Sequence, residues 1–170
     1  VLVVPPSFGA NTLAELIATA KKNPGTLTFG SAGNGSSNHL TGELFKTMVG
    51  IDITHVPYKG SAAAITDLLG GRISMMFEAI STQTQHIASG MVKALAVSRA
   101  TRSNALPSVP TLAEAGLPGF DVSIWLGLAA PKGTPPEIVR QLNQYLNRVL
   151  TQEEIKTKLD KRTGKVVEEN

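Results

Sequence analysis

The residues best suited to chemistry lie in one stretch that is rich in glycine and small hydroxyl side chains. Gly30, Gly33 and Gly35 can adopt backbone angles closed to other residues and let a ligand approach the main chain. Ser36 or Ser37 can then cap a following helix, because a serine oxygen accepts a hydrogen bond from its first turn. Such a helix presents unpaired N–H groups and the positive end of its dipole, which favours a carboxylate or a phosphate.

Polar side chains outside this stretch could contact the same ligand. His39 falls in the first turn of the expected helix and could either contact the ligand or simply cap the helix. Lys59 could pair with an anion or be a solvated turn lysine, and Glu78 could accept a hydrogen bond from a ligand hydroxyl or ammonium group, or cap a helix. The candidate ligand-binding residues are Ser31, Ala32, Gly33, Asn34, Gly35, Ser36, Ser37, His39, Lys59, Gly60, Ser61 and Glu78.

Enzyme motifs fit the glycine-rich stretch poorly. The run that starts at Gly33 invites comparison with the dinucleotide-binding fingerprint, but Asn38 replaces its third glycine and Asp52 lies at the start of the next strand. The glycines are not followed by Lys and then Ser or Thr as in a P-loop, and the chain has no Gly-x-Ser-x-Gly sequence. A nucleotide-dependent enzyme that uses the glycine turn is therefore only the alternative function.

The histidines and the absence of cysteine argue against a metal site and a cysteine-based active site. His39, His55 and His86 lack the spacing of metal ligands, and His55 and His86 are interpreted as structural or surface histidines. The chain has no cysteine, which excludes disulfides, thiolate metal sites and a cysteine nucleophile. We therefore expect no catalytic residue, no metal and no cofactor.

The charge pattern does not indicate a nucleic-acid partner. The chain has 16 Lys and Arg residues against 13 Asp and Glu residues, a net charge of +3. These charges are scattered, and the mild basic cluster at 156–165 is interrupted by acidic residues, as on a solvated helix face. No apolar run approaches the roughly 20 residues that span a bilayer.

The elements that must position the candidate residues alternate between strand and helix. Strands are predicted at 1–4, 26–29, 51–56, 73–77 and 92–98, and helices at 13–22, from Ser36 or Ser37 to 49, at 61–69 and at 80–89. This alternation over short connections is typical of an α/β fold with a mostly parallel sheet and helices on both faces. Ligands of such sheets bind beyond the carboxyl ends of the strands, where 31–37, 58–61 and Glu78 all fall.

Finer expectations concern the faces and caps of three helices. The helix that follows the glycine turn is predicted to bury a stripe made of Leu40, Leu44, Phe45 and Met48. Ser61 is predicted to cap the helix at 61–69, and a short helix is predicted at 111–116.

The last fifty residues follow a different pattern. An extended apolar segment at 120–130 contains Trp125, and a proline-rich linker precedes a strongly amphipathic helix at 136–150. A second helix is predicted from 152 to about 161. We place a boundary near 120–125 and expect two packing units, 1–122 and 123–170.

Three segments together resemble a known family over essentially the whole chain: TFGSAGNGSSNHLTGELFKTMVGIDITHVPYKGSAAAITDLLGGRISMMFE, ALAVSRATRSNALPSVPTLAEAGLPGF and WLGLAAPKGTP. They resemble the substrate-binding proteins of tripartite tricarboxylate transporters, also called the Bug family. The resemblance implies a receptor with a type II periplasmic-binding-protein-like fold, not an enzyme. Such a periplasmic receptor has two lobes that close on a small carboxylate and deliver it to the membrane permease subunits.

The resemblance also implies which parts of that receptor the chain contains. In the family two glycine-bearing loops, one per lobe, hold carboxylates partly through bound water, and the second corresponds to 31–37 followed by His39. The first loop has no counterpart here, so we expect most of the first lobe before Val1 and a shorter segment after Asn170. Residues 1–122 would be the second lobe, and 123–170 a partial segment of the first, with hinges at 1–5 and 120–125.

Two further expectations concern Glu78 and the helix at 136–150. Glu78 stands where an Asp or Asn is more usual in the family, which affects any ligand preference inferred from that position. The apolar face of the helix at 136–150 must also be covered by the body of the chain or by a second copy, so self-association of the chain is possible.

Overall fold

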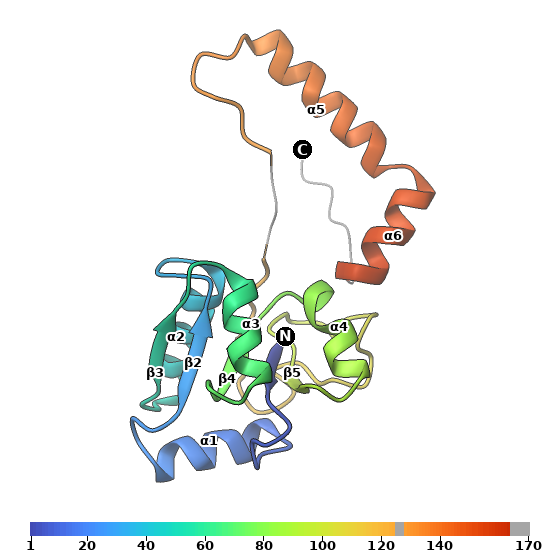
Figure 1. Ribbon diagram of the computed structural model, residues 1–170. Helices are drawn as coiled ribbons and strands as arrows, with labels where there is room; N and C mark the ends of the chain where they lie inside the picture. The colour runs from blue at the N-terminus through green and yellow to red at the C-terminus, as the bar shows by residue number, and fades with distance from the viewer. Residues whose placement is uncertain (125–127, 164–170) are drawn as a thin grey trace.

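The computed structural model describes residues 1–124 and 128–163, with side chains described up to 159 (Figure 1). In chain order its elements are β1 (Leu2–Val4), α1 (Leu13–Lys22), β2 (Thr28–Ser31), α2 (Ser37–Val49), β3 (Thr54–Pro57), α3 (Ser61–Leu69), β4 (Met75–Phe77), α4 (Ile80–Ala88), β5 (Lys93–Ala96), α5 (Pro136–Leu150) and α6 (Glu153–Thr163). The predicted alternation of strands and helices is confirmed for the first hundred residues.

The strands form one mixed sheet in the order β3-β2-β4-β1-β5. β2 pairs in parallel with β3 and β4, whereas β1 pairs antiparallel with both β4 and β5. β2, β3, β4 and β5 therefore point in one direction and only β1 opposes them. The sheet is mostly parallel, as the sequence predicts, and its parallel strands end at a common edge.

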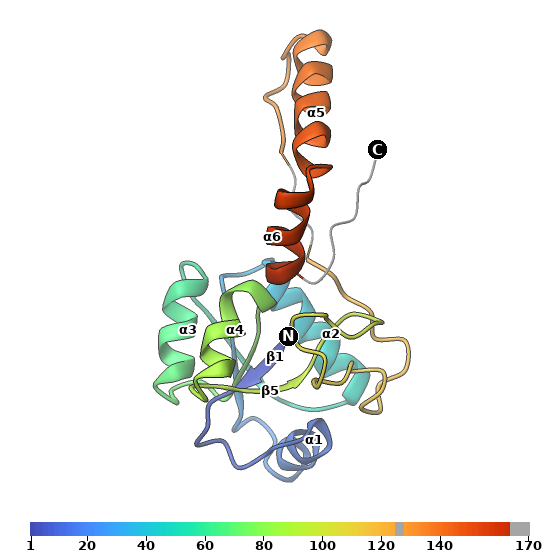
Figure 2. The same ribbon diagram turned by 90° about the vertical axis from the view of Figure 1, so that its right-hand side faces the viewer.

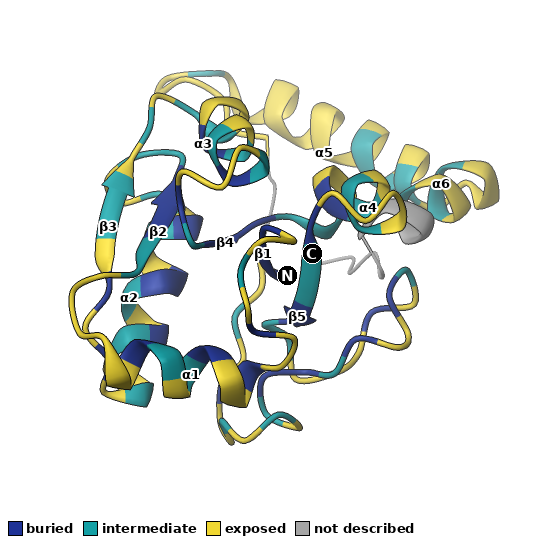
Figure 3. Ribbon diagram, turned by 60° about the horizontal axis from the view of Figure 1, so that its bottom comes forward, coloured by how far each residue is buried: buried dark blue, intermediate teal, exposed yellow. Residues whose placement is uncertain are grey.

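Alternating side chains of the strands divide the core into two layers. Leu2, Met75 and Phe77 pack with α1 and α2 on one face of the sheet. Val3 and Met76 pack with α3 and α4 on the other face. The central strands appear fully buried in Figure 3, which explains why their sequences are continuously apolar instead of alternating.

Local capping signals set several helix boundaries as predicted. Thr12 caps α1 by accepting a hydrogen bond from the Glu15 N–H at 3.2 Å, and Glu15 in return accepts from the Asn11 N–H at 2.6 Å. Gly50 ends α2 in the left-handed conformation, with φ of 66°, which few other residues adopt.

Three predictions are wrong, one about a helix face, one about a helix cap and one about a short helix. Of the stripe predicted to be buried on α2 only Phe45 is buried, while Leu40, Leu44 and Met48 are 58%, 40% and 40% exposed. Ser61 does not cap α3 but is its first residue, and Gly60 occupies the cap position with φ of 110° and no side-chain bond. Residues 111–116 form turns in which Thr111 and Glu114 bond each other's backbone, not a helix.

The carboxyl-terminal helices extend away from the sheet. Figures 1 and 2 show α5 standing off the body, while α6 returns toward it and contacts α4. The segment predicted to be extended at 120–130 includes residues 125–127, which lie outside the described residues, and 120–124 and 128–130 contain no strand. Among the described helices none is long and apolar enough to cross a membrane.

Candidate functional site

Three strand ends bring the predicted site residues to one edge of the sheet. The Tyr58 N–H, just after β3, donates to the carbonyl of Ser31 at 3.1 Å, and the Gly60 N–H donates to the carbonyl of Ala32 at 3.1 Å. The Asn38 side chain donates to the carbonyl of Phe77, the last residue of β4, at 2.6 Å. The loops that carry 31–37, 58–61 and Glu78 are therefore neighbours, as the strand order requires.

Two glycines shape the loop after β2. Gly33 has φ of 131° and Gly35 has φ of 76°, both in the region that favours glycine. A side chain at Gly33 would also place its Cβ 3.2 Å from the carbonyl oxygen of Tyr58. Glycine at these positions lets the chain turn sharply from β2 into α2 beside the loop after β3.

Ser36 is the residue that caps α2. Its Oγ donates to the carbonyl of Gly33 at 2.7 Å and accepts from the His39 N–H at 3.4 Å. Ser37 begins the helix, and its side chain is exposed. Among the described residues no acceptor is bound to the backbone N–H groups of Asn34, Ser37 and Asn38, so these donors and the positive end of the helix dipole are free for an anion. We call 31–38 the cradle.

Two histidines beside the cradle are bonded to it, one at a backbone N–H and the other at a side-chain hydroxyl. The Gly35 N–H donates to His39 Nδ1 at 3.0 Å, and the Ser31 hydroxyl lies 2.6 Å from His55 Nε2. The Gly33 N–H in turn donates to Ser31 Oγ at 3.1 Å. The Ser31 hydroxyl, the Gly35 N–H and His39 Nδ1 are therefore engaged in internal hydrogen bonds. They fix the shape of the cradle and are not available to a ligand.

Glu78 lies buried at the end of β4, next to the first turn of α2. One carboxylate oxygen accepts from the Ala79 N–H at 2.8 Å, and the other accepts from the Asn38 side chain at 3.3 Å. No Lys or Arg of the described chain forms a salt bridge with it. Glu78 therefore lies beside the cradle at the same edge of the sheet, and its bonds fix its orientation.

The loop after β3 is held by a polar group that sequence reasoning did not identify. The Tyr58 hydroxyl donates to Asp67 on α3 at 2.8 Å, and Arg72 bonds the same carboxylate at 2.8 Å. Burial and the bond to Asp67 raise the pKa of Tyr58 to about 12. Lys59 at this loop is exposed, and it makes no salt bridge within the part of the chain that the structure describes.

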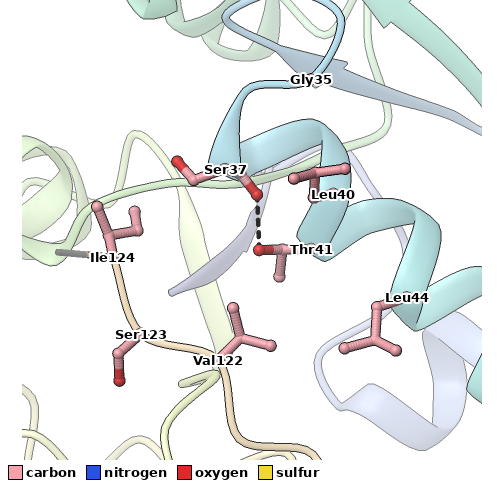
Figure 4. Close-up of a pocket in the computed structure, with 8 residues that line it drawn as sticks. All are labelled: Gly35, Ser37, Leu40, Thr41, Leu44, Val122, Ser123 and Ile124. Carbon is pink, nitrogen blue, oxygen red and sulfur yellow. Dashed lines mark hydrogen bonds between the residues drawn. The ribbon is translucent and has the colours of Figure 1, made fainter.

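A hollow of about 660 Å³ opens beside the cradle (Figure 4). It is lined by residues of the cradle, of the exposed face of α2 and of the segment after Phe120: Gly35, Ser37, Leu40, Thr41, Leu44, Val122, Ser123 and Ile124. The Thr41 hydroxyl donates to the carbonyl of Ser37 at 2.7 Å, so it is turned into the helix. The sequence did not predict this hollow, because Leu40 and Leu44 were assigned to the core.

The described side chains around the cradle do not form a group that could hold a metal ion. Within the described ranges no three His, Asp or Glu side chains gather in a way that could hold a metal ion. The site offers backbone donors, hydroxyls and one buried carboxylate, which is a set for hydrogen bonding to a ligand.

Comparison with known sequences identifies the family to which the chain is similar. The profile of the tripartite tricarboxylate transporter family receptor matches residues 1–170. A UPF0065 protein in the tcbD-tcbE intergenic region of Pseudomonas sp. (strain P51) is 44% identical over 151 residues, which cover 88% of this chain and 45% of that protein. Protein BugT of Bordetella pertussis is 43% identical over 150 residues, which cover 88% of this chain and 46% of BugT. The chain thus spans less than half the length of these two relatives.

Solved structures agree with the sequence comparison. An R. palustris protein with adipate is 40% identical, with a TM-score of 0.89 over 93% of this chain and 53% of that chain. The periplasmic binding protein BugD is 36% identical, with a TM-score of 0.90 over 98% of this chain and 56% of BugD. MatC from Rhodopseudomonas palustris with bound malate is 34% identical, with a TM-score of 0.90 over 98% of this chain and 56% of MatC.

Proposed function

This chain belongs to the tripartite tricarboxylate transporter receptor family, and we propose that it is about half of a periplasmic receptor that captures a small carboxylate. The family and its structural neighbours are solute-binding proteins, not enzymes. The whole receptor would deliver its ligand to the membrane permease subunits of the transporter.

One observation supports a carboxylate as the ligand. Ser37 and Asn38 begin α2 with backbone N–H groups that no acceptor in the described chain satisfies, and the Asn34 N–H lies in the turn before them. A carboxylate at this position would accept from these groups and gain from the helix dipole. Two structural neighbours were solved with adipate and with malate, both of which are small dicarboxylates, and this supports the same ligand class here.

The surroundings of the cradle suggest how the rest of the ligand is accommodated. The hollow beside Ser37 is lined largely by apolar side chains, among them Leu40 and Val122, which suit a short aliphatic chain. Glu78 has carboxylate oxygens beside the cradle and would favour a ligand that also carries a hydroxyl or ammonium donor. Lys59 and Gly60 lie on the adjacent loop, Ser61 begins α3 directly after it, and all three would contribute to the rim of the site.

We assign residues 1–122 to the second lobe and 123–170 to the segment that completes the first lobe. Phe120 and Val122 still pack into the core around the sheet, whereas α5 stands away from it, which supports a boundary in this region. The opposing half of the site would come from the portion of the receptor that the relatives have and these residues do not include. Closure of two such lobes about 120–125 would exclude water from the ligand.

The proposal is tested by calorimetric titration of the full-length receptor that contains this chain. Malate, adipate and citrate are compared with AMP and NAD at the same concentrations. We expect saturable heat with at least one carboxylate and none with the nucleotides, because the cradle lacks the lysine that a phosphate loop supplies. Binding of a nucleotide without any carboxylate would overturn the proposal in favour of the nucleotide-dependent alternative.

A further inference from the structure

We propose that His39 and His55 are positioning residues that hold the cradle in its binding shape only while the His39 ring is neutral, so that acid releases the loop. The effect of this release on ligand binding rests on the proposed function. The bonds between the histidines and the loop are a property of the chain itself and do not depend on that function.

The two rings come from different elements and meet under the cradle. His39 lies in the first turn of α2 and His55 in β3, and their ring centroids are 4.0 Å apart with an interplanar angle of 23°. Phe29 of β2 stacks on His55 with centroids 4.9 Å apart. The stack therefore ties the helix that follows the cradle to the two strands that flank it.

Each ring is bonded to a group of the cradle, His39 to a backbone N–H and His55 to a side-chain hydroxyl. His39 Nδ1 accepts from the Gly35 N–H at 3.0 Å, which requires a free lone pair and hence an unprotonated Nδ1. His55 Nε2 meets the Ser31 hydroxyl at 2.6 Å, and that hydroxyl accepts from the Gly33 N–H. The two cradle glycines with positive φ are thus each held by a histidine. His39 bonds Gly35 directly, and His55 acts on Gly33 through Ser31.

Protonation breaks the direct bond. A doubly protonated His39 ring would present an N–H to the Gly35 N–H, so this hydrogen bond cannot persist. A second charge on His55 would also face the first across stacked rings 4.0 Å apart. Both effects act on the loop that carries Asn34, directly before the free N–H groups of Ser37 and Asn38.

Within the described residues, the charged groups that the structure places against the pair are Glu43 and Lys46 of α2. Glu43 Oε1 is 4.0 Å from His39 Nε2, and the Lys46 ammonium lies 3.1 Å from Glu43 and 5.9 Å above the Phe29 ring. From the strands the neighbours are Phe29 and Ser31 of β2, which carry no charge. Burial, His39 and Lys46 lower the pKa of His55 below its ordinary value, and Glu43 opposes them. The folded chain therefore disfavours the charged form of His55.

Nuclear magnetic resonance on the 170-residue chain tests the coupling without a ligand. Between pH 8 and pH 5 the amide signal of Gly35 should shift with the same midpoint as the His39 ring, and its hydrogen exchange should accelerate once the bond is lost. In His39→Asn the amide oxygen can replace Nδ1 as an acceptor that does not titrate, so the Gly35 signal should become independent of pH. His86→Asn, on α4 and away from the cradle, should leave the Gly35 titration unchanged.

The results of these experiments can contradict the coupling of His39 to the loop and the proposed function independently of each other. A Gly35 signal that stays constant while His39 titrates would overturn the coupling. In the full-length receptor, binding of a carboxylate that is fully ionised throughout should weaken about fivefold to tenfold from pH 8 to pH 5, the effect of losing one hydrogen bond. Binding that is independent of pH would overturn the inference and leave the proposed function intact, whereas a coupled loop in a receptor that binds no carboxylate would overturn only the proposed function.

Discussion

Ser36 and Ser37 are adjacent and identical in chemistry, yet the fold gives them different tasks. The Ser36 hydroxyl is bonded to Gly33 and to the His39 N–H, so its replacement would damage the helix cap. The Ser37 side chain is exposed at the start of α2, makes no bond that holds the cap, and lines the hollow beside the proposed ligand position. Substitutions at Ser37 therefore report on binding more cleanly than substitutions at Ser36.

The candidate residues could be located from the sequence because parallel strands end at the same edge of a sheet. Their individual roles could not be predicted, because these depend on contacts between distant residues. The Gly35 N–H and the Ser31 hydroxyl look available in the sequence, but His39 and His55 bind them. His55 was interpreted as structural or surface, and only its pairing opposite Phe29 in β2 reveals its position under the cradle.

Gln83 on α4 is a buried residue whose polar atoms find no partner within the described chain. Leaving such a group unsatisfied costs about 1 to 3 kcal/mol, and methionine has a similar shape without that cost. We expect Gln83→Met to raise the melting temperature by a few degrees in a thermal denaturation experiment. Gln85→Met on the exposed side of the same helix is the control and should change little, and a lower melting temperature for Gln83→Met would contradict this account.

At the scale of elements, α2 is rotated relative to the orientation that its apolar residues predict. Gly42 faces Phe29 so closely that a Cβ would lie 2.3 Å from the ring, and Asn38 is bonded to the end of β4. These two contacts bury the small and polar side of the helix and leave Leu40 and Leu44 to line the hollow. The hydrophobic pattern alone could not show this, because the approach of the helix depends on the absence of a side chain at Gly42.

Replacing Gly42 by alanine tests that packing. Alanine gains about 1 kcal/mol of helix propensity over glycine, but its Cβ would displace the fully buried Phe29 ring, and overpacking costs about 1 to 3 kcal/mol. We expect a net loss of unfolding free energy in urea denaturation. Thr47→Ala on the exposed face of α2 is the control, and the account fails if Gly42→Ala is the more stable protein.

Element boundaries were predictable where the signals are local. Thr12 and Glu15 place the start of α1, and the prolines before Glu137 place the start of α5. The turns at 111–116 carry the same Thr and Glu signal as α1, but Gly116 and Pro118 stop the chain from continuing into a helix.

At the scale of the whole molecule, α5 carries a face that nothing in the described chain covers well. Most of its apolar residues are exposed, namely Ile138, Val139, Leu142, Tyr145 and Val149, while Leu146 and Leu150 are half-buried. The regular spacing of these residues made the helix predictable, but the surface that receives it was not predictable from its sequence. Under the proposed lobe assignment, this face would pack against the part of the receptor that the relatives have and these residues do not include.

The chain of 170 residues should therefore self-associate through α5 when studied alone, because exposed apolar stripes of this kind are unfavourable in water. Leu142 is 55% exposed at the centre of the stripe, and Leu142→Glu should shift the chain toward the monomer in light scattering. Gln141→Glu adds the same charge beside it and serves as the control. A chain that is monomeric at high concentration without any substitution would contradict this prediction.

The most direct test of the carboxylate cradle is calorimetry on the full-length receptor with substitutions at Ser37. A glutamate at this first position of α2 suits the helix dipole, so it should preserve the fold while placing a competing carboxylate at the ligand position. The account predicts that Ser37→Glu loses binding by more than about tenfold, while Ser37→Ala, which keeps every backbone N–H group, retains it. An unchanged Kd in Ser37→Glu would show that the ligand is not held at the start of α2.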